Sequence, residues 1–317
     1  MMRALSAIAQ LFAIAALAAA EEPLPRPPPD LVRLDNGTVK VGLDQSMGAS
    51  ITHLSWTGHA GNAVNSYDPG RLIQQSYYAG IRIDRRAEGQ HEAWSPWNWN
   101  PIQGGGVGSW SEVKRCEKLE DGTVFSVTIP KLWDMSDEPA AALMHQWTGF
   151  EPSMPNVVRV RCELVSKRDS DDRWGPARRN HQEVPATYFI RCFDTFRSYL
   201  GDGRWRLESC KFGPPWSRTK APRDALACFA SNGQGIAIFS PEASTWNYGP
   251  TLEGDSDDPL DPACVHIAGV TTAELGRRST YRYRYWIVVG KEKQIAKRLD
   301  ELWVKYSSER AELRVEE

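Results

Sequence analysis

The sequence predicts an all-β protein, a large antiparallel β-sandwich followed by a C-terminal amphipathic helix. Apolar and polar residues alternate repeatedly, most clearly over residues 158–164 and 281–289, as in half-buried antiparallel strands. The 13 Trp, 10 Tyr, 25 Gly and 21 Pro also favour strands and turns over a helical bundle. No long helical stretch separates the strand candidates, so a parallel βαβ arrangement is not expected.

The N-terminus predicts export. Arg3 precedes an apolar run, residues 4–17, and the alanines at 18–20 fit the small-residue rule of signal peptidase. This run is shorter than the roughly 20 residues of a membrane span, so an uncleaved anchor is the weaker alternative. We expect a signal peptide (residues 1–20), cleavage after Ala20, and a secreted or periplasmic protein without a membrane span. A Pro-rich tether (21–30) then leads into a single domain (31–317).

The strand candidates are spread along most of that domain. They are residues 38–43, 50–56, 124–129, 158–164, 186–193, 225–230, 235–239, 264–269 and 281–289. The one convincing helix is expected over residues 291–308, where Ile295, Leu299, Leu302 and Tyr306 share one apolar face. We expect this helix to pack on the sandwich, and the charged tail (309–317) to be frayed.

Composition and missing motifs exclude several classes of function. Lys and Arg number 38 against 40 Asp and Glu, so no basic field is available to bind nucleic acid. The chain contains neither the nucleophile elbow G-x-S-x-G of serine hydrolases nor a His-Glu-x-x-His zinc motif. No cofactor and no metal are expected. One exception stays open: Asp255, Asp257, Asp258 and Asp261 offer the oxygens that Ca²⁺ prefers, although a solvated acidic loop explains them more simply.

A polar and aromatic region, residues 62–110, is the best candidate for ligand binding. Its tryptophans at 94, 97 and 99 fit neither helical nor strand spacing, so they pack on the core or receive a ligand. Sugar rings have apolar faces edged by hydroxyls, which indole faces and amide or guanidinium donors complement. The candidate residues of this region are Asn65, Arg71, Gln74, His91, Trp94, Trp97, Trp99, Asn100 and Gln103.

Acid–base candidates lie outside that region. His181 and Glu183 are two residues apart, so they point to the same side of an extended chain, with Tyr188 on the opposite side unless Pro185 breaks the pattern. A histidine beside a carboxylate can exchange protons at neutral pH. His145 is a further candidate, although a lone histidine among apolar neighbours is often a core residue.

A Trp-rich, exported, all-β chain of this length resembles the galactose mutarotase-like supersandwich, found in sugar epimerases and in domains of glycosidases and polysaccharide lyases. The resemblance covers most of residues 31–290 and rests on architecture and composition. It implies an early Asn and Arg at positions 65 and 71, and two histidines at 91 and 145, around a sugar. Residues 71–103 also resemble stretches of uncharacterised exported bacterial proteins. The late Glu of the epimerases has no motif-bearing counterpart here, since nothing around Glu274 matches the family.

We therefore expect an enzyme that cleaves a polysaccharide or oligosaccharide, with a non-catalytic carbohydrate-binding or cell-surface module as the alternative. For a lyase acting on a uronate-containing glycan, Arg71, Asn100 or Gln103 would neutralise the substrate carboxylate. His181 or His145 would take the proton, and Tyr188 would protonate the leaving oxygen. For a glycoside hydrolase, Glu183 would need a second carboxylate, and Asp134 or Asp194 is the nearest candidate. The donor-rich loop slightly favours the lyase.

Overall fold

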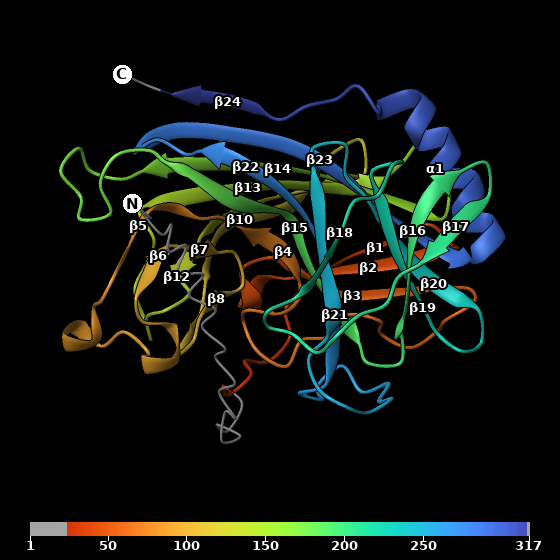
Figure 1. Ribbon diagram of the computed structural model, residues 1–317, viewed down its shortest axis with the longest axis horizontal. Helices are drawn as coiled ribbons and strands as arrows, with labels where there is room; N and C mark the ends of the chain where they lie inside the picture. The colour runs from red at the N-terminus through yellow and green to blue at the C-terminus, as the bar shows by residue number, and fades with distance from the viewer. Residues whose placement is uncertain (1–23, 316–317) are drawn as a thin grey trace, which may run out of the picture.

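The computed structural model of the protein describes residues 24–315, so the expected signal peptide lies outside the described residues and stays a prediction. Residues 24–30 contain no helix or strand, and β1 begins at Leu31. Two ten-stranded antiparallel sheets form the body of the molecule, as the sequence predicts (Figure 1). No helix among the described residues has the length and apolar character needed to cross a membrane.

Sheet I contains the strands that carry the candidate site. Its order is β1 (Leu31–Asp35), β2 (Val39–Asp44), β3 (Ser50–Trp56), β4 (Ile73–Ser76), β15 (Arg179–Ile190), β22 (Cys264–Glu274), β21 (Thr245–Pro250) and β18 (Ser217–Thr219), with β7 (Pro101–Ile102) joining β4 to β12 (Lys131–Leu132). The hairpins β5 (Ala79–Ile83)–β6 (Trp97–Trp99) and β8 (Gly105–Gly106)–β9 (Ser109–Trp110) lie outside both large sheets, and the 3₁₀ turns are η1 (Gln45–Met47), η2 (Arg86–Glu88) and η3 (Glu92–Trp94).

Sheet II forms the other layer. Its order is β10 (Glu112–Lys118), β11 (Val124–Ile129), β13 (Ala142–Phe150), β14 (Val157–Lys167), β23 (Arg278–Lys291), β20 (Gln234–Phe239), β19 (Ala225–Phe229), β16 (Thr195–Gly201) and β17 (Arg204–Leu207). The tail expected to be frayed instead forms β24 (Glu312–Val315), which pairs with β23. An ion pair between Arg284 and Glu309 holds the chain just before this strand.

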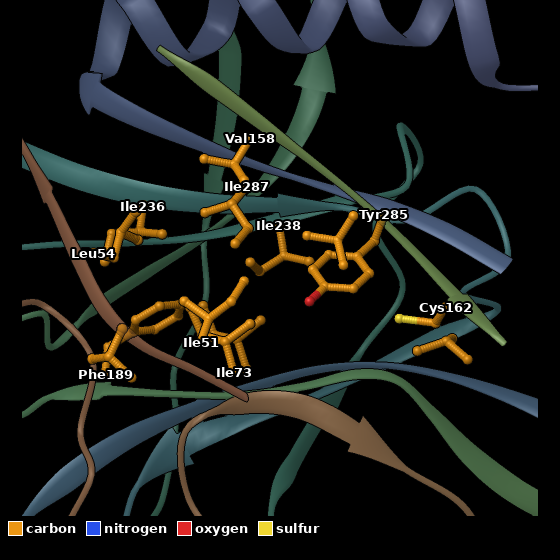
Figure 2. Close-up of a cluster of buried hydrophobic side chains, with 14 of the residues drawn as sticks. Ile51, Leu54, Ile73, Val158, Cys162, Phe189, Ile236, Ile238, Tyr285 and Ile287 are labelled. Carbon is orange, nitrogen blue, oxygen red and sulfur yellow. The ribbon is translucent and has the colours of Figure 1, made fainter. Parts of the chain in front are cut away.

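The core lies between the two sheets. In Figure 2, Ile51, Ile73 and Phe189 of sheet I face Ile238 and Ile287 of sheet II, and all five side chains are fully buried. Because side chains alternate along a strand, the neighbours of these residues in the sequence point to the outer faces. The alternation that predicted the strands therefore also determines which residues of sheet I reach the candidate site.

The helix α1 (Glu292–Tyr306) confirms the expected C-terminal helix and covers part of the outer face of sheet II. Its apolar face is buried, and Figure 1 shows it at the end of the molecule where β16, β17 and β20 lie. A carboxylate fixes this contact, because Glu151 accepts hydrogen bonds from Trp286 Nε1 at 2.9 Å, Lys305 Nζ at 2.7 Å and the Tyr306 hydroxyl at 2.6 Å. The outer face of sheet I is thus separated from α1 by the whole sandwich.

Candidate functional site

The outer face of sheet I carries a row of side chains in direct register across five strands. The row consists of Gln74 on β4, Ala186 on β15, Ala268 on β22, Asn247 on β21 and Arg218 on β18. The two alanines at its centre are the smallest side chains that a strand can place there short of glycine. Longer side chains from the rows on either side can therefore meet above them.

A register shift in β15 brings the acid–base candidates onto this one face. Glu183 pairs with Val270 and Ala186 pairs with Ala268, so β15 contains one more residue than β22 between these two pairs. Such a bulge reverses the alternation of the residues that follow it. Tyr188, which strict alternation would place on the opposite side, therefore shares the outer face with Glu183, and the open alternative at Pro185 is the one that the structure adopts. The strand also begins at Arg179, seven residues before the predicted start, which places His181 and Glu183 within it.

Glu183 and His266 form the central pair. Glu183 Oε1 lies 3.6 Å from Nε2 of His266. The other ring nitrogen, Nδ1, lies 3.2 Å from the carbonyl oxygen of Thr187, which can only accept, so Nδ1 carries a proton and Nε2 is the ring nitrogen that faces Glu183. His266 is fully buried, whereas the Glu183 side chain is 15% exposed. Glu183 is therefore the member of the pair that a ligand can reach.

Aromatic rings enclose His266 on both faces. The ring centroid of Tyr188 lies 4.3 Å from that of the imidazole, and the centroid of Trp216 lies 4.5 Å from it. Burial raises the pKa of the Tyr188 hydroxyl well above its ordinary value, and the nearby charge of Glu183 adds to the shift. The same two causes raise the pKa of Tyr78. Both phenols thus stay protonated at neutral pH and can donate a proton or a hydrogen bond.

A wall of four aromatic rings stands on the β4 side of the pair. Tyr78, Trp97, Trp94 and Trp133 follow one another with centroid separations of 6.3, 5.4 and 5.6 Å. Trp133 reaches its place because Gly70 lacks a Cβ, which would otherwise lie 2.5 Å from the indole ring. This wall contains two of the predicted sugar-binding tryptophans, at positions 94 and 97.

Three predicted binding amides hold the backbone. Asn100 donates to the carbonyl of Tyr77 at 2.7 Å and accepts a hydrogen bond from Trp97 Nε1 at 3.0 Å. Gln103 donates to the carbonyls of Gly48 and Ala49, and Gln74 donates to that of Pro69 at 2.9 Å. All three side chains are at least 99% buried, and so is Trp99 in the core. These four residues therefore shape the site from below, where a ligand does not reach them.

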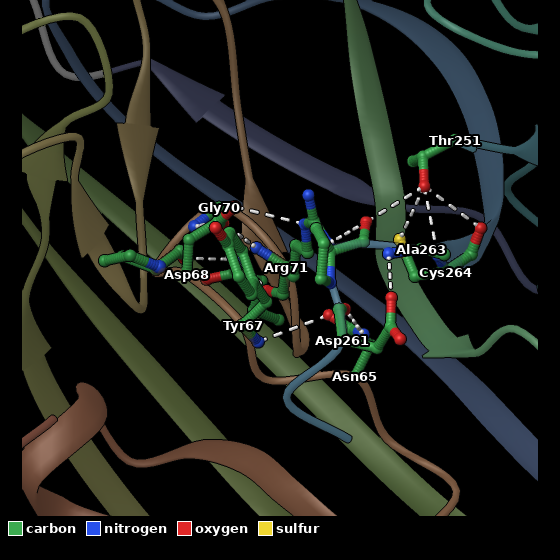
Figure 3. A network of polar contacts seen from close by, with 12 residues as sticks. Asn65, Tyr67, Asp68, Gly70, Arg71, Thr251, Asp261, Ala263 and Cys264 are labelled. Carbon is green, nitrogen blue, oxygen red and sulfur yellow. Dashed lines mark hydrogen bonds and ion pairs between the residues drawn. The ribbon is translucent and has the colours of Figure 1, made fainter. Parts of the chain in front are cut away.

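Asn65 and Arg71 have a similar function in the loop between β3 and β4 (Figure 3). The Asn65 amide donates to the carbonyl of Asp261 at 2.8 Å, and Arg71 Nη1 donates to that of Pro262 at 2.6 Å. Arg71 Nε also pairs with Asp68 at 3.0 Å. These contacts tie the loop to the chain that precedes β22, so two nitrogens of the Arg71 guanidinium are already engaged.

The histidines predicted from the sequence lie in different places. His181 is exposed on β15, two residues before Glu183. His91 forms the N-cap of η3, where Nδ1 accepts from the Ala93 amide at 3.2 Å. His145 lies on the outer face of sheet II, where its Nδ1 contacts Glu163 at 2.7 Å and Glu163 pairs with Arg282. Because the sandwich separates it from Glu183, His145 cannot belong to the same site.

His266 and Trp216 are the site residues that sequence reasoning missed. His266 occupies every second position with Cys264 and Ala268, between the buried Val265 and Ile267, so the alternation already placed it on the outer face. No sequence pattern indicated that Trp216, fifty residues earlier, stacks on it. Among residues 24–315, no group of three or more His, Cys, Asp or Glu side chains is arranged to hold a metal, the acidic residues 255–261 included. The six cysteines are free thiols in this part of the chain.

Comparison with solved structures finds distant similarities. The chain is similar to an aldose 1-epimerase-like protein from Escherichia coli K12, with a TM-score of 0.48, 10% identity, and coverage of 83% of this chain and 99% of that one. It is also similar to a galactose mutarotase-like protein from Clostridium acetobutylicum (TM-score 0.43, 9% identity, 83% and 96% coverage) and to a polysaccharide lyase (0.42, 10%, 85% and 35%). No protein-family profile matches the sequence, and no curated protein is significantly similar to it.

Proposed function

We propose that the protein is an exported carbohydrate-active enzyme that cleaves a polysaccharide or oligosaccharide at the outer face of sheet I, by elimination on a uronate-containing glycan. The observation that supports this most is the set of groups around Glu183. A buried imidazole lies 3.6 Å from its carboxylate. Two protonated phenols, Tyr78 and Tyr188, lie near enough for the charge of Glu183 to help raise their pKa. An aromatic wall beside an acid–base cluster is what a sugar-cleaving site needs, since indole rings pack on the apolar faces of sugars.

Elimination assigns one role to each of these groups. A base takes the proton at the carbon next to the uronate carboxylate, the bond from the ring to the leaving oxygen breaks, and an acid protonates that oxygen. Glu183 is the accessible base, and His266 is a positioning residue buried directly behind it. Tyr188 is the acid, because its hydroxyl is protonated at neutral pH and its side chain shares the outer face with Glu183. A cation must also neutralise the substrate carboxylate as the enolate develops.

Hydrolysis would require a second carboxylate beside Glu183, and the two predicted partners are engaged elsewhere. Asp134 is 2% exposed and accepts a hydrogen bond from Gln90 at 2.6 Å. Asp194 lies beside Arg191 at 3.8 Å. The imidazole and phenols around Glu183 therefore favour elimination over hydrolysis. A non-catalytic carbohydrate-binding module remains the rival, because the aromatic wall alone would suffice for binding.

A screen of neutral and uronate polysaccharides separates these possibilities. Reducing ends with the ultraviolet absorbance of unsaturated uronate indicate a lyase, reducing ends without it a hydrolase, and binding without product a module. Glu183→Gln and Tyr188→Phe should each lower kcat by roughly 100-fold or more. The control Glu117→Gln alters an exposed ion pair on sheet II and should leave kcat unchanged. Near-normal turnover of both site variants would contradict the assignment.

Export has its own test. The intact mass of the protein recovered from the medium or periplasm should correspond to a chain that begins at Glu21. A mass that includes residues 1–20 would show that the predicted signal peptide is retained.

A further inference from the structure

A cavity lies between the helix α1 and the turn that joins β16 to β17, at the end of the molecule where these elements meet (Figure 1). Its volume of about 430 Å³ is within the roughly 300–1,000 Å³ that sites for small molecules occupy. The indole of Trp205 and the side chain of Ala296 give it an apolar surface, and lysines and carboxylates complete the lining. Because α1 packs on the outer face of sheet II, this cavity lies on the opposite layer of the sandwich from Glu183.

Hydrogen bonds hold the two walls of this cavity at a fixed spacing. The Tyr199 hydroxyl donates to the carbonyl of Ala296 on α1 at 3.1 Å and accepts from the amide of Gly203 in the turn at 3.0 Å. The Asp300 carboxylate on α1 accepts from the amide of Asp202 in the turn at 3.1 Å. The helix and the turn are therefore tied together at two points, and the cavity is formed before any ligand enters it.

The lining combines an aromatic ring with donors and acceptors. The Trp205 indole packs on the Tyr199 ring, with the centroids 4.7 Å apart, and it is only partly buried. Lys293 and Lys297 lie one helical turn apart on the exposed face of α1, and neither forms an ion pair within residues 24–315. Asp300 adds a carboxylate. Sugar rings match this combination, because they present an apolar face edged by hydroxyls that both donate and accept.

The charges around the cavity nearly cancel. Three of its four carboxylates are paired with arginines, in the pairs Glu292–Arg197, Glu301–Arg298 at 2.6 Å and Asp202–Arg204 at 3.6 Å. The fourth, Asp300, shares the lining with the two unpaired lysines. Neither an anion nor a cation gains a large net attraction from such a balanced set, because each meets like charges at close range. A neutral sugar meets no such repulsion and uses both the donors and the acceptors.

We infer that this cavity is a second carbohydrate site, which binds a neutral sugar unit against the Trp205 indole, with Lys293, Lys297 and Asp300 bonded to the sugar hydroxyls. Hydrogen bonds in which one partner is charged are stronger than neutral ones. The inference goes beyond the proposed function, since the ligand is neutral and the site is remote from Glu183. Such a site holds the enzyme on the neutral portion of a glycan while the outer face of sheet I stays free.

Binding of neutral hexasaccharides tests this inference without any reaction. We would measure the Kd of cellohexaose, xylohexaose and mannohexaose by calorimetry, for the wild type and for Trp205→Ala, Lys297→Ala and Asp300→Ala. At least one hexasaccharide should bind, and each variant should raise its Kd roughly tenfold. Trp303→Ala is the matched control, because Trp303 is a partly buried tryptophan of α1 that does not line the cavity. It should bind as the wild type does. Lys297→Ala and Asp300→Ala remove no buried apolar side chain, so they test the site even if Trp205→Ala does not fold.

Several results would overturn the inference. It is wrong if no neutral hexasaccharide binds, or if all three variants bind as the wild type does. Tighter binding of hexagalacturonate or of spermidine at this cavity would also contradict it. The proposed function is tested separately, since the three variants should keep the wild-type kcat on a soluble uronate glycan and Glu183→Gln should keep the affinity for the neutral sugar. If Glu183→Gln abolishes that affinity, the neutral sugar binds on sheet I and the cavity is not its site.

Discussion

Asn100 holds the indole of Trp97 in the aromatic wall. It accepts from Trp97 Nε1 at 3.0 Å and donates from Nδ2 to the carbonyl of Tyr77 at 2.7 Å, while being almost fully buried. Asn100→Ala leaves the Tyr77 carbonyl without this buried partner, so we expect the free energy of unfolding to fall by about 1–3 kcal/mol. Urea denaturation measures this, and the glycan Kd should rise with it. Asn98→Ala, which removes one half-buried bond to Gly80, should cost less.

Gly70 gives Trp133 the room to close the wall. A Cβ at this position would lie 2.5 Å from the indole ring, so Gly70→Ala should displace the ring and weaken glycan binding. The control is Gly61→Ala. Gly61 is exposed, and a Cβ at this position would lie no closer than 3.6 Å to the nearest side chain, that of His59. Affinity measured by calorimetry should fall for the first variant alone. Equal affinities would show that Trp133 does not contribute to binding.

His266 can be tested as a positioning residue. His266→Phe keeps a ring between Tyr188 and Trp216 but removes the Nε2 that faces Glu183. We expect kcat to fall by about tenfold or more with KM nearly unchanged, because the interaction acts on proton transfer rather than on substrate binding. Steady-state kinetics on the best substrate from the screen decide this. A rise in KM at constant kcat would assign His266 to binding instead.

Glu151 couples the stability of the fold to pH. Burial alone would raise the pKa of this carboxyl, but hydrogen bonds from Lys305, Tyr306 and Trp286 outweigh it and hold the pKa below the ordinary 4.5. A carboxyl with a lowered folded-state pKa stabilises the fold above pH 4.5, and this stability is lost as the pH falls through the folded-state pKa. Glu151→Gln should therefore be less stable than the wild type at pH 7 in urea denaturation. The difference should shrink below pH 4.5, and a constant difference would contradict this.

Asp224 should give the stability of the fold the opposite pH dependence to that of Glu151. Burial raises the pKa of this carboxyl to about 7, against an ordinary value of 3.8. The folded state then holds the proton more tightly, so the stability gained from it is complete below about pH 4 and lost as the pH rises through 7. Asp224→Asn should remove this pH dependence. Its urea midpoint should therefore rise relative to that of the wild type as the pH increases from 5 to 8. Asn also tolerates the φ of +51° at this position.

Local alternation was enough to predict most of the fold. The predicted strands at 50–56 and 124–129 match β3 and β11 residue for residue. The helix was found because its apolar positions follow a period of 3.6. The tail 312–315 was missed because it contains only two apolar residues, Leu313 and Val315, and both stay exposed when the tail pairs with β23.

The site was predicted only where its residues are neighbours in the sequence. Glu183 and Tyr188 lie on one strand, whereas His266 and Trp216 join them through strand pairing over tens of residues. Amide side chains presented a second difficulty. Asn100 and Gln103 have the same donors whether they face a sugar or a buried carbonyl, and only the packing of the loop decides between the two.

The extra residue in β15 has a consequence for how such a site is gained or lost in evolution. Because the bulge between Glu183 and Ala186 sets which way Tyr188 points, deleting one residue there would turn the remainder of the strand over and direct its hydroxyl-bearing ring into the core. Every amino acid of the site could remain unchanged while its chemistry disappeared. In homologous sequences, a one-residue gap at this position therefore predicts loss of function better than any single replacement nearby.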